Sequence, residues 1–147
     1  MTNRVEVLLW SVALPGFGQI INRKYVKGVA LLGLEFLINL QSNFNVVIQL
    51  SFKGQIDKAI SLTNYQWLMF YPCLYLFSIW DAYRDAGGGD SPYAYLPFVI
   101  PAYFTTVGLI YSPKLELFGN LWGPVWLPIL FCGVGCSLGL MLKALLT

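Results

Sequence analysis

The sequence predicts an all-α, polytopic integral membrane protein: a bundle of four or five transmembrane helices that opens with a kinked or re-entrant hairpin. Composition is the first reason, because 57% of the 147 residues are hydrophobic and 11% are charged, whereas an ordinary soluble domain is roughly 25% charged. The second is that period-two alternation is absent, and lipid accepts only helices or closed barrels. No long polar stretch is left for a second domain, so 1–147 is expected to form a single membrane domain.

Five apolar segments compete for the length of a spanning helix, which needs about 20 residues, with a range of about 17–25. The first is short and broken by Pro15-Gly16, so a kink or a re-entrant turn is expected there. The second becomes polar after its first turns, the third is aromatic throughout, and the last two carry prolines. In chain order the segments are 5–21, 29–50, 67–83, 94–111 and 122–142.

Polar connectors separate these segments. The longest carries three charges and is expected to contain an interfacial turn of helix. The next contains Gly87-Gly88-Gly89, which we interpret as a flexible hinge between the motif-bearing N-terminal helices (5–86) and a C-terminal helix pair (94–146). The last closes the final hairpin. In chain order, these three connectors are 51–66, 84–93 and 112–120.

The cations predict the orientation, because Lys and Arg in short loops collect on the cytoplasmic side. If the first segment spans the membrane, the cations of 23–27 share one face with Arg84 and Lys143. If it is re-entrant, Arg4 joins this group and the bias grows. Either way 23–27 is expected to be cytoplasmic, and the side of the N-terminus stays open. The cations of the opposite face are Lys53, Lys58 and Lys114, together with Arg4 if the first segment spans.

A motif between the first two apolar segments is the most distinctive stretch of the chain. Proline and glycine break the helix, and Gly18 lets the backbone bend or another helix approach closely. The amides of Gln19 and Asn22 can satisfy backbone groups freed by the break. We interpret the motif as a tight membrane hairpin; binding of anionic lipid headgroups is the alternative. Its residues are Pro15, Gly16, Gly18, Gln19, Asn22, Lys27 and Gly28.

Together with Trp80-Asp81-Ala82-Tyr83, this motif resembles the two-transmembrane-helix domain family of small bacterial membrane proteins. The pattern of that family is approximately Pro-Gly-x-Gly-Gln-x-Tyr-Asn-Gly, then Lys-Gly and a leucine-rich helix, and later a Trp-x-Asp or Ile-Asp-Ala signature. The likeness covers roughly 7–86. Ile21 replaces an aromatic residue, Arg23 replaces a glycine, and the final helix pair is extra. The resemblance implies a bacterial cell membrane protein and little about activity, since most of the family has no established catalytic residue.

Glu35 is the most informative ionisable residue, because a charge near the bilayer centre costs at least about 2.5–3.5 kcal/mol. Asn39, Ser42 and Gln49 follow it at helical spacings, so one stripe of this helix is polar and should face other helices or a wet cavity. One hypothesis is a proton- or solute-handling path or a partner contact, formed by Glu35, Asn39, Gln49 and Asp81. The other is interhelical hydrogen bonding.

Asp81, Arg84 and Asp85 are spaced to pair with one another at a helix end. Two carboxylates with an arginine could instead bind a divalent cation or the basic segment of a partner. Self-pairing is the expectation.

Small residues dominate the second half of the last segment. Gly135 and Gly139 form a Gly-x-x-x-Gly motif, which lets helices pack closely or dimerise. Cys132 and Cys136 share the same helix, but metal binding is not expected there because the chain has no histidine.

No activity is evident from the sequence. A nucleophile–base pair, a phosphate-binding loop and a nucleotide motif are absent, and a net charge of +2 without a basic stripe argues against nucleic acid. We expect no catalytic residue, cofactor or metal.

The leading hypothesis is a non-enzymatic multi-pass protein of the bacterial inner membrane, a scaffold that contacts the lipid bilayer, a membrane-protein partner or a second copy of itself. The alternative is a small transporter or channel subunit with a polar path lined by Glu35, Asn39 and Gln49. A membrane enzyme that acts on a lipid, with Asp81 and Asp85 around a metal, is the third hypothesis.

Overall fold

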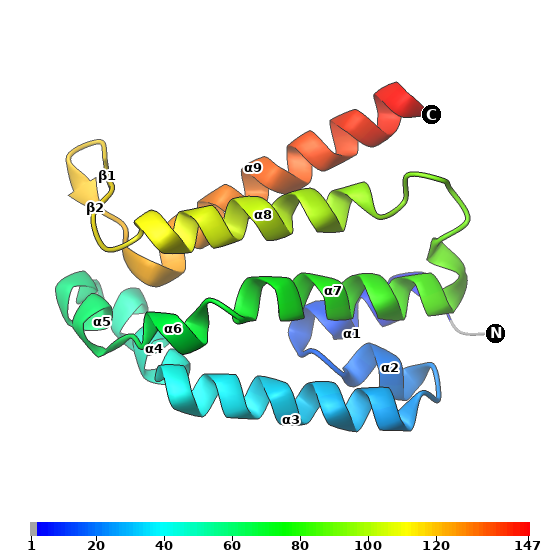
Figure 1. The fold of residues 1–147 in the computed structure, drawn as a ribbon, viewed down its shortest axis with the longest axis horizontal. Helices are drawn as coiled ribbons and strands as arrows, with labels where there is room; N and C mark the ends of the chain where they lie inside the picture. Colours follow the sequence, from blue (N-terminus) through cyan, green and yellow to red (C-terminus); the bar gives the residue numbers. More distant parts are fainter. Residues whose placement is uncertain (1–2) are drawn as a thin grey trace.

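The computed structural model describes residues 3–147, and over this range the chain is mainly helical (Figure 1). The predicted all-α class is therefore confirmed. The elements are α1 (Arg4–Ala13), α2 (Phe17–Ile21), α3 (Tyr25–Ser42), α4 (Phe44–Phe52), α5 (Ile56–Leu62), α6 (Tyr65–Leu68), α7 (Tyr71–Tyr83), the π-helical turn η1 (Arg84–Gly88), α8 (Leu96–Tyr111), β1 (Glu116–Leu117), β2 (Asn120–Leu121) and α9 (Gly123–Leu146).

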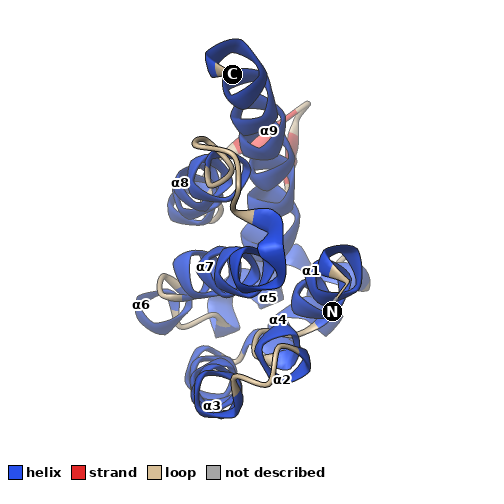
Figure 2. Cartoon of the chain, turned by 90° about the vertical axis from the view of Figure 1, so that its right-hand side faces the viewer, coloured by secondary structure: helices blue, strands red, loops and turns tan. Residues whose placement is uncertain are grey.

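Helices α3, α7, α8 and α9 run back and forth along one direction (Figure 1). One end of the molecule, called the η1 end below, holds the start of α1, the α2–α3 turn, η1 and the end of α9. Figure 2 looks onto this end. The opposite end, called the α5 end, holds α4, α5, α6 and the β1–β2 hairpin. The main buried apolar cluster lies there, where Val47, Ala59 and Val125 bring α4, α5 and α9 together.

The first apolar segment is two short helices rather than one. Asn3 caps α1, since its side-chain oxygen accepts from the Val5 backbone N–H at 2.9 Å. Helix α1 ends before Pro15, and Gly16 has φ +103, a backbone conformation that favours glycine. Helix α2 then returns toward the η1 end (Figure 1). Of the two expected alternatives, the structure therefore has the hairpin geometry.

The second predicted helix, 29–50, is wrong in its length. Helix α3 ends at Ser42, and α4 continues at an angle of 65°. The break lies at Asn43, which has φ +62 and donates from its side-chain amide to the Leu62 carbonyl at 2.8 Å. Asparagine adopts this left-handed conformation more readily than most residues, and here its side chain bonds the backbone of a distant segment.

The other predicted helices are confirmed with small shifts. The third segment is divided into α6 and α7, and α8 and α9 correspond to the fourth and fifth segments. Prolines stand in the first turns of α7, α8 and α9, where their missing N–H costs no helical hydrogen bond. The expected helical turn between the second and third segments is α5. The short strands β1 and β2 were not predicted.

Two glycines of α9 pack this helix against α8. A Cβ on Gly135 would lie 2.5 Å from the Cα of Pro101, and one on Gly139 would lie 2.6 Å from the Leu96 carbonyl oxygen. Gly133, on another face of α9, has open space around it. The Gly-x-x-x-Gly motif therefore serves close packing within the chain.

By length and composition, α9 is the one described helix that can cross a membrane, or one of two if the bent pair α3–α4 counts as a span. Helix α8 is apolar but shorter. These criteria support one or two membrane spans, so the expected four or five are not confirmed by them.

Candidate functional site

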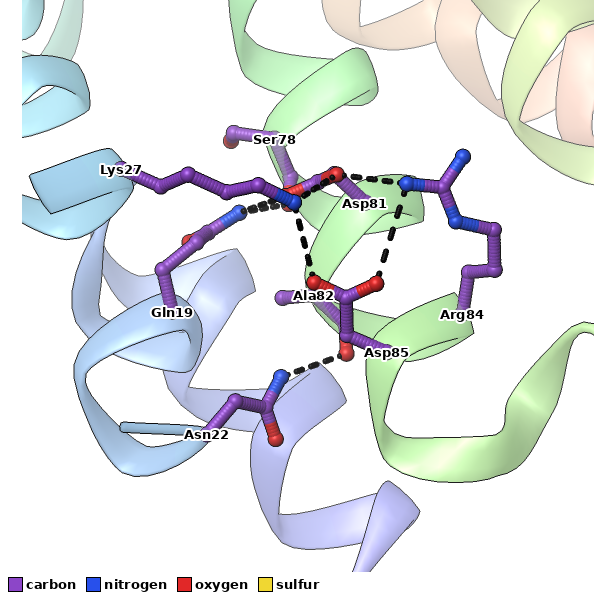
Figure 3. A network of polar contacts seen from close by, with 8 residues as sticks. All are labelled: Gln19, Asn22, Lys27, Ser78, Asp81, Ala82, Arg84 and Asp85. Carbon is purple, nitrogen blue, oxygen red and sulfur yellow. Dashed lines mark hydrogen bonds and ion pairs between the residues drawn. The ribbon is translucent and has the colours of Figure 1, made fainter. Parts of the chain in front are cut away.

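A network of polar side chains ties the N-terminal hairpin to the end of α7 (Figure 3). At its centre is Asp81, with a side chain that is 5% exposed. Its Oδ1 lies 2.9 Å from Nζ of Lys27 and 2.8 Å from the Arg84 guanidinium. Its Oδ2 accepts from Nε2 of Gln19 at 3.1 Å. One buried carboxylate therefore receives a cation from α3, a cation from η1 and an amide from α2.

Asp85 extends the network toward solvent. Its Oδ2 lies 3.0 Å from Nζ of Lys27, and its Oδ1 lies 3.7 Å from the Arg84 guanidinium. Two carboxylates and two cations thus form a neutral cluster that we call the Asp81 network, together with Gln19 and Asn22. Lys27 precedes the apolar part of its segment, and the pKa of its ammonium is raised by hydrogen bonds to Asp81 and Asp85, partly opposed by burial.

The two motif amides bind the backbone of α7. Gln19, which is fully buried, donates to the Ser78 carbonyl at 2.8 Å, and Asn22 donates to the Ala82 carbonyl at 2.8 Å. Both carbonyls lie in the second half of α7, so each amide adds a hydrogen bond from outside the helix to the α7 backbone. The expectation that both amides satisfy groups freed at the Pro15 break is therefore corrected: they join the hairpin to α7.

The motif glycines allow the close approach that these hydrogen bonds require. A Cβ on Gly18 would collide with the Ser11 side chain and lie 2.7 Å from the Cβ of Ala82. A Cβ on Gly16 would lie 2.6 Å from the Gly28 carbonyl oxygen, and one on Gly28 would lie 3.0 Å from the Gly16 carbonyl oxygen. Pro15 is also fully buried. The small residues thus place α2 directly against α1, α3 and α7.

The structure brings together two of the four residues of the predicted polar path. Glu35 and Asn39 line one cavity. Gln49 is exposed on α4 and does not line this cavity, because the bend at Asn43 takes α4 out of the line of α3. Asp81 belongs to the network at the η1 end.

The residues considered for metal binding have other partners. Asp81 and Asp85 contact Lys27 and Arg84. The Cys136 thiol lies 3.9 Å from the Pro97 carbonyl oxygen, which again joins α9 to α8. Within 3–147, no group of three or more His, Cys, Asp or Glu side chains is placed to hold a metal ion.

Two features of the site were missed by reasoning from the sequence. The Lys27–Asp81 pair joins residues 54 positions apart, and helical spacing predicts only the local pairs of Asp81 with Arg84 and Asp85. No local pattern signals this pair, because the spacing already offers Asp81 a partner at its own helix end. The second feature is Tyr71, which lies beside Glu35. No motif or residue spacing in the sequence singles out Tyr71.

Comparisons of this chain with protein-family models, with curated proteins and with solved structures found no match. The resemblance to the two-transmembrane-helix domain family stays a prediction. Chemically, the Asp81 network can hold the hairpin against α7, and it leaves neither carboxylate without a cation.

Proposed function

We propose that this chain is a multi-pass protein of the bacterial inner membrane, in which the α1–α2 hairpin enters the bilayer part way from the cytoplasmic side. Its role is non-enzymatic: it is a scaffold that contacts lipid and membrane partners. The observation that carries the proposal is the Asp81 network, which anchors α2, the α2–α3 turn and the start of α3 to the end of α7.

Exposed apolar surface supports the membrane location. In the most apolar 18-residue window of α9, only 28% of the residues are buried, whereas the apolar core helix of a soluble protein is mostly buried. Large apolar side chains are exposed on α3, α7 and α8 as well, among them Phe36, Phe77 and Tyr103. Soluble monomers rarely expose contiguous apolar surface on this scale, whereas lipid solvates it.

The lengths of the helices support several crossings and a hairpin that stops part way. Helices α3, α8 and α9 have 18, 16 and 24 residues, or about 27, 24 and 36 Å at 1.5 Å per residue. The hydrocarbon core of a bilayer is about 30 Å thick. Helix α1, with 10 residues, reaches only about 15 Å.

The cations support the orientation. Six of the nine lie in elements at the η1 end and three in elements at the α5 end (Figure 1). Excess Lys and Arg marks the cytoplasmic side, so the η1 end is assigned to the cytoplasm. The six are Arg4, Arg23, Lys24, Lys27, Arg84 and Lys143, and the three are Lys53, Lys58 and Lys114.

Labelling of single cysteines from either side of the membrane tests the hairpin. Asn3→Cys, Lys24→Cys and Lys58→Cys are placed separately in a background where Cys73, Cys132 and Cys136 are serine. A membrane-impermeant maleimide should reach the first two only in inverted vesicles and the third only in spheroplasts. Labelling of Asn3→Cys from the same side as Lys58→Cys would mean that the first segment spans, and the hairpin would be wrong.

Purification from the native membrane in mild detergent tests the scaffold role, with bound proteins and lipids both identified. A stoichiometric protein or lipid that survives purification supports a scaffold. A chain that is recovered alone from the same membranes contradicts it. Transport of a solute by the purified protein in vesicles would favour the alternative function.

A further inference from the structure

The hairpin leaves space beside the second half of α3. The chain turns back at Pro15, and a cavity of about 570 Å³ lies between the hairpin tip, α3, α4 and the start of α7. We call it the Glu35 cavity. Its lining includes Leu14, Glu35, Phe36, Asn39, Phe44 and Tyr71.

Glu35 brings an unpaired carboxylate to this cavity. The residue is 8% exposed, and its Oε2 is buried without a hydrogen-bond partner. The Tyr71 hydroxyl lies beside the carboxylate, and no Lys or Arg is among the residues that line the cavity. Burial of an ionised carboxylate is strongly unfavourable unless a cation accompanies it. A cationic ligand in the cavity would offset this cost for the ionised carboxylate.

The other unpartnered oxygens differ from that of Glu35. They belong to Ser11, Gln19 and Asn22, which lie at the packed interface between the hairpin and α7. None of these three lines a described cavity. Glu35 alone among the four combines an unpartnered oxygen with adjacent open space.

The lining selects an organic cation over a metal ion. Calcium needs six to eight oxygen ligands, and magnesium needs near-octahedral coordination. The asparagine side chains do not supply these, because Asn39 and Asn45 bond each other, at 3.1 Å between side chains and 3.3 Å from the Asn45 N–H. The cavity is instead lined by the aromatic side chains of Phe36, Phe44 and Tyr71, with Phe44 and Tyr71 in contact at 4.8 Å between ring centroids, and aromatic rings attract an ammonium group.

We propose that the Glu35 cavity binds an organic ammonium ion that has an apolar body. The carboxylate pairs with the nitrogen, the aromatic rings surround it, and Leu32, Leu40 and Ile48 contact the hydrocarbon part. Phe36 is 67% exposed and Leu40 is 58% exposed, so the ligand enters from the molecular surface. The ammonium belongs either to a soluble amine or to the headgroup of a lipid. The inference goes beyond the proposed scaffold role and does not depend on it.

Equilibrium binding to the full-length protein tests the proposal. Radiolabelled 2-phenylethylammonium is the probe, in dodecyl maltoside that contains no amine lipid, and 2-phenylethanol is the uncharged competitor of similar shape. We expect saturable binding of the ammonium, with the alcohol competing at least about tenfold more weakly, because it cannot pair with the carboxylate. Absence of saturable binding, or equal competition by the alcohol, would overturn the proposal.

Two variants and a matched control locate the site. Glu35→Gln should weaken binding by about tenfold or more, while Glu6→Gln, the same change at an exposed glutamate of α1, should leave it unchanged. Leu40→Trp fills the cavity from an exposed position and should also reduce binding, which keeps the test valid if Glu35→Gln does not fold. Wild-type affinity in both folded variants would overturn the assignment.

Competition by phosphatidylethanolamine distinguishes the two sources of the ammonium. If the lipid displaces the probe from wild-type protein, the ligand is a lipid headgroup. If the probe binds and the lipid does not displace it, the ligand is a soluble amine. Both results support the cavity, and neither bears on the cysteine labelling that tests the hairpin.

Discussion

Asp81 shows how one side chain can organise distant parts of a chain. Two cations and one amide, from α3, η1 and α2, converge on its carboxylate. Lys27 and Arg84 keep 46% and 47% of their side-chain surface exposed, so both remain partly hydrated while Asp81 is buried. This arrangement limits the desolvation cost that makes fully buried ion pairs poor stabilisers.

Asp81→Asn should destabilise the protein by about 2 kcal/mol. Loss of one partner of a fully buried pair costs roughly 3–5 kcal/mol, and the exposure of Lys27 and Arg84 lowers this figure. Unfolding in mixed micelles measures the difference. Asp90→Asn, a change of the same kind at a residue for which no ion pair is described, is the control. Equal stability of the two variants would contradict a central role for Asp81.

At the scale of the element, the helices of this chain are joined where small residues allow backbones to meet. Helix α2 approaches α3 at Gly16 and Gly28, and α9 approaches α8 at Gly135 and Gly139. In lipid, two helices gain no hydrophobic stabilisation by associating, because lipid tails are as apolar as the neighbouring helix. Their association therefore depends on close packing of this kind. The two glycine motifs therefore perform the same task at opposite ends of the sequence.

Gly139→Ala should destabilise the α8–α9 pair. The new Cβ would meet the Leu96 carbonyl oxygen and the Pro97 Cα at 2.6 and 2.8 Å, and overpacking of this kind costs about 1–3 kcal/mol. Gly133→Ala is the matched control, because its Cβ meets nothing within 4 Å. It should be neutral or stabilising by up to about 1 kcal/mol, since alanine favours a helix over glycine. Thermal unfolding in detergent compares the two, and equal effects would argue against close packing at Gly139.

At the scale of the whole molecule, apolar surface and charge bear on two different properties, the membrane location and the orientation. In the proposed membrane arrangement, the exposed apolar helices face lipid, and the surplus of cations at the η1 end sets that end on the cytoplasmic side. The acidic partners of Lys27 and Arg84 lie at the same end, but Asp and Glu contribute little to orientation.

Removal of three cations from the η1 end should produce a mixed orientation. Arg4, Arg23 and Lys24 lie outside the Asp81 network, and their replacement by glutamine leaves three cations at each end. A C-terminal reporter that is active on only one side of the membrane measures the fraction inverted. Replacement of Lys53, Lys58 and Lys114 instead should strengthen the original orientation. A single orientation in both variants would contradict assignment by the cations.

Composition and local pattern were sufficient for the helical class, for the approximate positions of most helices and for the break at Pro15-Gly16. These features depend on neighbours in the chain: a proline removes a backbone donor, and an apolar run favours a helix in lipid, whatever the rest of the chain does. The same reasoning found the motif residues and the isolated charge of Glu35, because both stand out from their local surroundings.

Only the tertiary structure decided what these residues contact. Local pattern predicted that Gln19 and Asn22 serve their own turn, that α3 continues to residue 50, and that Gln49 extends the Glu35 stripe. In the structure both amides bind α7, and the bend at Asn43 separates Gln49 from Glu35. Partners far apart in sequence are chosen by how helices dock, which depends on shape and buried hydrogen bonds across the whole chain and leaves no periodic signal at either residue.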